Sequence, residues 1–151
     1  MDRSLDNAML VTPTINSVHG RIFSHSGDIP AAGAEISLTV PARRRWRIIS
    51  LHFSFATTVA AANRFPILSI DNGSILLLKI PIVTAQTASL THHYYYSATH
   101  QPEIIIGVNR LYPLPPLTLV SDYNIFTQTI GIEDTDEYTA PILLIEEWIN
   151  P

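Results

Sequence analysis

The stretch from residue 40 to residue 81 constrains the fold most, because its large apolar residues recur at every second position. Residues 46–58 are predicted to form one strand, and the polar face of that strand carries Ser50, His52 and Ser54. The apolar face of that strand carries Ile49, Leu51, Phe53 and Phe55. Side chains alternate between the two faces of a strand, whereas a helix would spread this spacing around its circumference. The stretch is therefore predicted to be extended.

Short turns and loops divide this stretch into three consecutive strands. Pro41-Ala42-Arg43-Arg44 precedes the first strand, and a loop at residues 60–63 leads into a second strand at residues 64–70. Asp71-Asn72-Gly73 then turns the chain into a third strand at residues 74–80. An Asn-Gly pair favours a type I′ turn, in which both central residues have a positive φ. Three antiparallel strands are predicted here.

The same pattern continues along the rest of the chain. Ile36, Leu38 and Val40 alternate with polar residues and are predicted to point inward. Further extended runs lie at residues 86–98, 103–108, 117–120, 123–132 and 142–149. About eight or nine strands without a helix predict an all-β fold, in which two antiparallel sheets pack as a jelly-roll-like sandwich. An immunoglobulin-like sandwich is the alternative.

Residues 1–33 are predicted to form an extended N-terminal arm, and residues 34–151 a single β-sandwich domain. The arm has no sustained period, and it is broken by Thr12-Pro13 and by Gly20. It either frays, apart from one short edge strand within residues 15–26, or becomes ordered against a neighbouring subunit.

The composition favours a protein whose surface is partly covered by another chain. Of 151 residues, 46% are hydrophobic and only 15% are charged, so much of the surface is apolar, although a dense β core is an alternative explanation. The formal net charge of -4 gives no basic field that would attract nucleic acid. The absence of cysteine excludes disulfides and thiolate chemistry. The sequence shows no signal peptide and no apolar run long enough to span a bilayer, so no membrane partner is expected.

No pattern in the sequence predicts catalysis, a cofactor or a metal site. His92 and His93 are adjacent on a predicted strand and point to opposite faces, so they cannot both bind one metal ion. The acidic run at residues 133–137 lacks the spacing of a calcium-binding loop and is predicted to be a solvated loop between two strands. Glu146 and Glu147 are likewise adjacent and point apart, which excludes a facing pair of carboxylates. The chain is therefore predicted not to be an enzyme.

Two clusters remain as candidate binding features. Arg43-Arg44-Arg45-Trp46-Arg47 is too small for a nucleic-acid patch, but its arginines could pair with acidic residues of a neighbouring subunit. A solvated turn is the alternative. Tyr94-Tyr95-Tyr96, with Tyr112 and Tyr123, could form an aromatic platform for sugar, which keeps a carbohydrate-binding module open.

Several short motifs carry a resemblance to a known class of proteins. They are Val40-Pro41-Ala42-Arg43-Arg44-Arg45-Trp46-Arg47-Ile48, Thr57-Thr58, Ala62-Asn63-Arg64, Ala85-Gln86-Thr87-Ala88-Ser89, Ala140-Pro141 and Glu146-Glu147-Trp148. Through them the chain resembles, over residues 34–149, small β-sandwich virion proteins of tailed bacteriophages. Within that class it is most similar to a capsid decoration (cement) protein.

The resemblance implies a structural protein that sits on the outer surface of a capsid, after synthesis in the host cytoplasm. It implies a homotrimer at threefold positions, with the major capsid protein as partner, and neither nucleic acid nor membrane. A tail, neck or head-fibre component is the alternative within the same class. The residues predicted to contact the capsid or a neighbouring subunit are Leu10, Val11, Ile15, Phe23, Arg43, Arg44 and Arg45.

Overall fold

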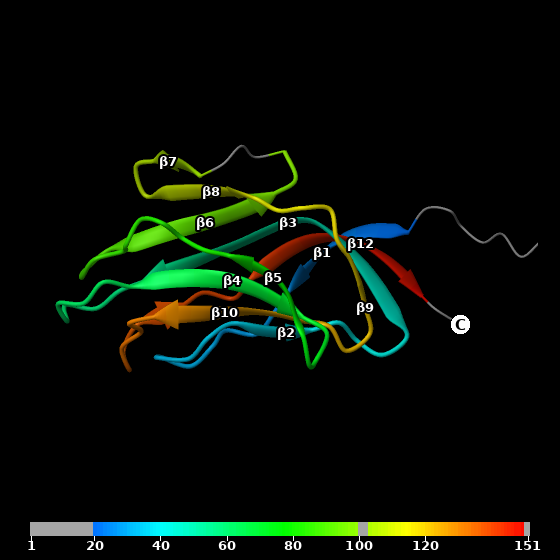
Figure 1. Ribbon diagram of the computed structural model, residues 1–151, viewed down its shortest axis with the longest axis horizontal. Coiled ribbons are helices and arrows are strands. Elements are labelled where there is room, and N and C mark those ends of the chain that lie inside the picture. The colour runs from blue at the N-terminus through cyan, green and yellow to red at the C-terminus, as the bar shows by residue number, and fades with distance from the viewer. Residues whose placement is uncertain (1–19, 100–102, 150–151) are drawn as a thin grey trace, which may run out of the picture.

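The chain folds into two β sheets that face each other (Figure 1). The structure is a computed structural model that describes residues 20–99 and 103–149. All regular secondary structure in these two ranges is β-strand. The prediction of an all-β sandwich of two sheets is confirmed.

The larger sheet has eight strands and is built around β3. Its path runs in the order β1, β12, β3, β6, β8 and β7, while β9 and β11 also pair with β3. All of these pairs are antiparallel except β6 with β8, which are parallel. The strands are β1 (Arg21–Ser26), β3 (Arg44–Ala56), β6 (Thr91–Ser97), β7 (Ile104–Ile106), β8 (Asn109–Pro113), β9 (Thr118–Val120), β11 (Glu137–Tyr138) and β12 (Ile142–Ile149).

The smaller sheet has four antiparallel strands in the order β2, β10, β4 and β5. In Figure 1 it occupies the lower part of the molecule, while β6, β7 and β8 of the larger sheet lie in the upper part. Its strands are β2 (Ser37–Thr39), β4 (Phe65–Asp71), β5 (Leu76–Ile80) and β10 (Asn124–Ile130).

Aromatic side chains from the larger sheet form the centre of the core. Phe55 stacks on Tyr138 with ring centroids 4.3 Å apart, and Phe53 stacks on Tyr94 at 5.3 Å. Each such pair contributes roughly 0.5–1.5 kcal/mol beyond the area that it buries. The predicted inward residues of β2 and its flanks are confirmed, because Ile36, Leu38 and Val40 are all buried.

A β-bulge in β3 changes which residues face the core. Ser50 pairs with Leu144 of β12, but Ile48 pairs with the next residue, Ile145, so Ile49 is extra in the ladder. An extra residue reverses the alternation of side chains along the bulged strand. The prediction that Ile49 belongs to the buried face was therefore wrong: Ile49 is only partly buried. The buried residues are Trp46 and Ile48 before the bulge, and Leu51, Phe53 and Phe55 after it.

The turn between β4 and β5 is a hairpin, as predicted, but it is not of type I′. Asp71 pairs with Leu76, and only Gly73 has a positive φ, of 85°. The loop is held by side chains instead, since Gly73 N donates to Asp71 Oδ1 and Ile75 N donates to Asn72 Oδ1, both at 2.8 Å. Asp and Asn close turns in this way because their short side chains reach the backbone two or three residues on.

Part of the predicted arm belongs to the sandwich. β1 pairs with β12 along its whole length, from Arg21 opposite Glu147 to Ser26 opposite Ile142. The sheet therefore begins before residue 34, where the domain boundary was predicted. Phe23 lies in β1, whereas Leu10, Val11 and Ile15 lie outside the described residues.

Candidate functional site

The predicted arginine cluster lies opposite the acidic end of β12. Trp46 pairs with Glu147 in the antiparallel ladder. On the inner face, the carboxylate of Glu147 accepts from Arg44 Nη1 through Oε1 and from Trp46 Nε1 through Oε2, both at 2.9 Å. One carboxylate therefore binds two side chains of β3.

On the outer face of the same ladder, two other arginines of β3 also contact β12. The Arg45 guanidinium carbon lies 4.8 Å from the centre of the Trp148 ring, and Arg47 forms an ion pair with Glu146. Glu146 is buried, and its Oε1 also accepts from Gly20 N at 2.8 Å. Arg44 and Arg45, which were predicted to contact other subunits, thus bind β12 of their own chain. The arginine cluster and Glu146-Glu147-Trp148 are both visible in the sequence, but the sequence could not show that they face each other.

Arg43 differs from its neighbours because it occupies the turn before β3. Arg44 N donates to Pro41 O at 3.1 Å, which closes the turn. Arg43 has φ 59° and is exposed. A residue other than glycine, asparagine or aspartate is uncommon in this left-handed region.

Phe23, the only one of the four predicted arm contacts that lies within the described residues, is partly buried and packs against the core. Its ring lies under the guanidinium of Arg21, with 4.7 Å between the guanidinium carbon and the ring centre. In the described structure Phe23 therefore holds an edge strand on its own sandwich.

A buried ion pair joins two loops at one end of the sandwich. Arg64 Nε donates to Asp136 Oδ2 at 2.9 Å, and both side chains have no exposed surface. Arg64 Nη1 also donates to the carbonyl oxygens of Ala60 and Ala62. Asp136 accepts from the backbone N–H groups of Thr58 and Glu133, each at 2.9 Å. The loop before β4 and the loop before β11 are thereby fastened together.

The charge state of Asp136 follows from these contacts. Burial by itself would raise the pKa of Asp136, because it penalises the charged carboxylate. The hydrogen bonds from Arg64, Thr58 and Glu133 outweigh burial and lower the pKa below its ordinary value. The predicted reading of residues 133–137 as a solvated loop was therefore wrong for Asp136, which is the buried partner of Arg64.

Gln86 fastens a third loop to the same end. Its backbone forms a bridge with Arg64, and its Nε2 donates to the carbonyl oxygens of Phe55 and Leu90 at 2.8 and 2.9 Å. Tyr94 donates its hydroxyl proton to Gln86 Oε1 at 2.8 Å. The short motifs around Thr57, Arg64 and Gln86 are thus explained by their structural role in connecting loops.

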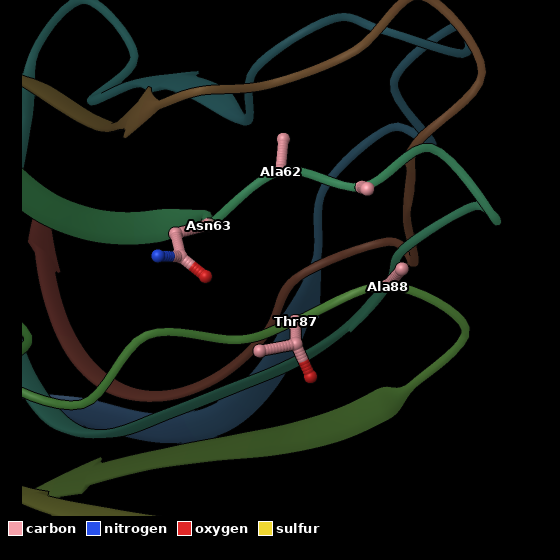
Figure 2. A pocket seen from close by; sticks show the side chains of 5 residues that line it. Ala62, Asn63, Thr87 and Ala88 are labelled. Carbon is pink, nitrogen blue, oxygen red and sulfur yellow. The ribbon is translucent and has the colours of Figure 1, made fainter.

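A shallow hollow lies between two of these loops (Figure 2). It has a volume of about 340 Å³ and is lined by Ala61, Ala62, Asn63, Thr87 and Ala88. Figure 2 shows Ala62 and Asn63 on one side and Thr87 and Ala88 on the other. The small side chains leave Asn63 and Thr87 as the polar groups of the hollow.

The outer face of the larger sheet carries a second group of polar and aromatic residues. His52 stacks on Tyr95 with ring centroids 4.4 Å apart, and the Ser54 hydroxyl lies 2.7 Å from His93 Nδ1. A hollow of about 350 Å³ adjoins them, lined by Tyr95, Ile106, Asn109 and Leu111. Within the described residues, no carboxylate hydrogen-bonds to His93, so Ser54 and His93 form a hydroxyl–imidazole pair without an acidic third member.

Most of the predicted aromatic platform is in the core. Tyr94, Tyr96 and Tyr112 are buried, and Tyr123 packs partly against the core. Burial raises the pKa of Tyr94, Tyr96 and Tyr112 above the ordinary value of a tyrosine. Only Tyr95, among the three consecutive tyrosines, points outward, and His52 covers one face of its ring. The five tyrosines therefore do not form one surface.

His92 and His93 point to opposite faces, as predicted. His92 is buried, and its Nδ1 lies 3.4 Å from Nε of the buried Arg110. Burial, followed by the nearby charges of Arg110 and His93, lowers the pKa of His92. In residues 20–99 and 103–149, no group of three or more histidine, aspartate or glutamate side chains is placed to hold a metal ion.

Two edge strands carry groups of exposed apolar side chains, and the first is β7. Its three residues, Ile104, Ile105 and Ile106, are 37%, 45% and 61% exposed, and Val108 in the following turn is exposed as well. Ile75, Leu76 and Leu77, at the start of edge strand β5, form a second exposed apolar group. Sequence analysis detected both strands but could not show that they are edges.

Comparisons with known proteins identify no family. No protein-family model matches the chain, and no curated protein matches it. Dimeric latent PorU from Porphyromonas gingivalis is similar in structure over 87% of this chain and 13% of that chain, with a TM-score of 0.48 and 13% sequence identity. A likeness at this level carries no argument about function. The described residues also contain no helix that is long and apolar enough to cross a membrane.

Proposed function

We propose that this protein is a non-enzymatic structural component of a phage particle, which binds the outer surface of the capsid as a decoration protein. The sequence resemblance supports a place in a phage particle, and the described surface is compatible with that place. The proposal includes the major capsid protein as partner and three copies meeting at threefold positions of the shell.

The observation that carries the proposal is the distribution of apolar and charged side chains. Isoleucines and leucines are exposed on the edge strands β5 and β7. Arg44, Arg47 and Arg64, by contrast, form ion pairs with Glu147, Glu146 and Asp136 of the same chain. Exposed apolar edges are typical of surfaces that another chain covers.

The internal ion pairs also change how binding is expected to respond to salt. Arg44 and Arg45 contact β12 of their own chain, so they are not available as a free basic patch. We infer that burial of apolar surface, rather than attraction between charges, provides most of the binding free energy. Binding would then depend weakly on ionic strength, because salt mainly screens exposed charges.

Stabilisation of the shell would follow from mass action. A protein that binds the assembled shell and not its dissociated subunits shifts the equilibrium towards assembly. The fastened loops around Arg64 and Gln86 suit such a role, because they give a binding surface that does not need to become ordered on contact.

The proposal is tested by mixing the purified protein with capsids that lack decoration and measuring co-sedimentation. We expect saturable binding that persists at high salt and a higher temperature of capsid disruption. Leu77→Lys on β5 tests the apolar edge, and Val59→Lys in the exposed loop before β4 is the matched control. The absence of co-sedimentation would contradict the proposal.

A tail or neck component is the alternative, and it predicts binding to tails or connectors instead of capsids. A carbohydrate-binding module predicts quenching of tyrosine or tryptophan fluorescence by oligosaccharides. Of the predicted platform, Tyr95 lines a surface hollow, so Tyr95→Ala is the variant expected to abolish such quenching.

A further inference from the structure

We propose that β7 is a self-association edge, through which two copies of this chain pair their larger sheets about a twofold axis. The inference rests on the described edge and not on the proposed phage role. It concerns the free protein in solution, whereas the threefold contacts are proposed for copies bound to the shell. It commits to a second copy of the same chain as the partner.

The backbone of β7 has hydrogen-bonding groups to offer. β7 and β8 are joined by the two-residue turn Gly107-Val108, with Ile106 opposite Asn109 and Ile105 opposite Arg110. The C=O of Val108, just before β8, accepts from His93 N. The backbone N–H and C=O groups of Arg110 and Tyr112 therefore also point towards β6, and those of Asn109 and Leu111 point towards β7. In an antiparallel pair, hydrogen-bonded and non-hydrogen-bonded positions alternate. Ile105 is therefore at a position whose N–H and C=O point away from β8, towards the free edge.

The side chains of β7 lack the features that normally protect an edge. Natural edge strands carry charges, prolines or bulges that prevent pairing with another chain. Besides β7, five described strands pair on one side only, and each contains a polar or charged residue. They are β1 with Arg21, β5 with Lys79, β11 with Glu137, β2 with Ser37 and Thr39, and β9 with Thr118. β7 alone is composed entirely of apolar residues, all of them exposed.

The edge is complementary to itself. An antiparallel pair centred on Ile105 places Ile105 opposite Ile105, and Ile104 of each copy opposite Ile106 of the other. No charged residue of β7 opposes this pairing, and the same surface is used by both copies, as a twofold interface requires. Ile104 of the second copy would lie beside Ile106, at the hollow lined by Tyr95, Asn109 and Leu111. The exposed isoleucines and this hollow would then be covered together.

The chain offers a direct test because it contains no cysteine. In the full-length Ile105→Cys variant, paired edges place the two new thiols within the distance that a disulfide spans. We expect a covalent dimer under mild oxidation, whereas Val59→Cys, in the exposed loop between β3 and β4, is expected to form no covalent dimer. Equal cross-linking of the two variants, or cross-linking of neither, overturns the proposal.

A second measurement does not depend on a new covalent bond. Light scattering across a dilution series is expected to give twice the mass of one chain, and Ile106→Lys is expected to halve that mass, while Val59→Lys leaves it unchanged. Circular dichroism confirms that each variant is folded. A wild-type monomer at every concentration, or a trimer that Ile106→Lys does not affect, overturns the proposal. Because this test uses no capsid, its failure leaves the capsid-binding result to be judged separately.

Discussion

Arg64 and Asp136 form an ion pair in which neither side chain reaches solvent, although they are 72 residues apart in the chain. The pair fastens the loop before β4 to the loop before β11. Its formation depends on the backbone acceptors and donors around it, because two charges are removed from water together.

We expect Arg64→Met to be strongly destabilising. The substitution leaves the carboxylate of Asp136 buried without its cation, and breaking such a pair costs about 3–5 kcal/mol. Urea unfolding followed by tryptophan fluorescence measures the loss. In Arg64→Met/Asp136→Leu no buried charge remains, so the double variant is expected to lose less than Arg64→Met alone. A double variant less stable than both single variants would contradict this account.

Stability is expected to fall as the pH drops below about 6.5, the ordinary pKa of histidine. Burial, together with Arg110 and His93, lowers the pKa of His92 in the folded state, so the unfolded chain binds a proton at a higher pH than the folded chain does. The stabilisation is therefore complete above the unfolded pKa and is lost progressively below it. His92→Gln should reduce the slope of the free energy of unfolding between neutral and mildly acidic pH. An identical slope in the variant and the wild type would remove His92 from the explanation.

Gly131→Ala is expected to cost more than Gly107→Ala. Both glycines have a positive φ, of 76° and 60°, so alanine introduces backbone strain of roughly 1 kcal/mol at either position. A Cβ at Gly131 would also lie 2.4 Å from the carbonyl oxygen of Asn63, whereas nothing lies within 4 Å of a Cβ at Gly107. The difference in melting temperature between the two variants therefore measures how closely the turn at Gly131 approaches the loop at Asn63. Equal losses would show that the backbone at Asn63 moves freely.

Arg43→Gly is expected to stabilise the fold by up to about 1 kcal/mol, because glycine adopts the left-handed conformation without a steric penalty. Arg43→Ala removes the same charge but keeps the strain, and it is the matched control. If both variants bind capsids as the wild type does, the guanidinium of Arg43 is not part of the interface. A loss of stability in Arg43→Gly would show that this side chain makes a contact worth more than the strain.

The strands were predictable from the sequence because alternation is a local property. The bulge at Ile49 was not, since it depends on how β12 aligns with β3. The same limit applies to the site: the arginines at the start of β3 and the residues Glu146-Glu147-Trp148 were both conspicuous, but only pairing across the sheet shows that they bind each other. Similarly, Ile104–Ile106 reads as any buried strand until the strand order places it at an edge.

Because β3 lies at the centre of the larger sheet, that sheet can be completed only after the last strands of the chain have been synthesised. Trp46 of β3 and Glu147 of β12 are separated by 101 residues, and β9, β11 and β12 all pair with β3. While these later strands are still inside the ribosome, the apolar face and both edges of β3 lack several of their native neighbours. Long-range strand pairing of this kind is slow, and its intermediates aggregate readily. The nascent chain is therefore expected to need protection by chaperones until β12 has emerged.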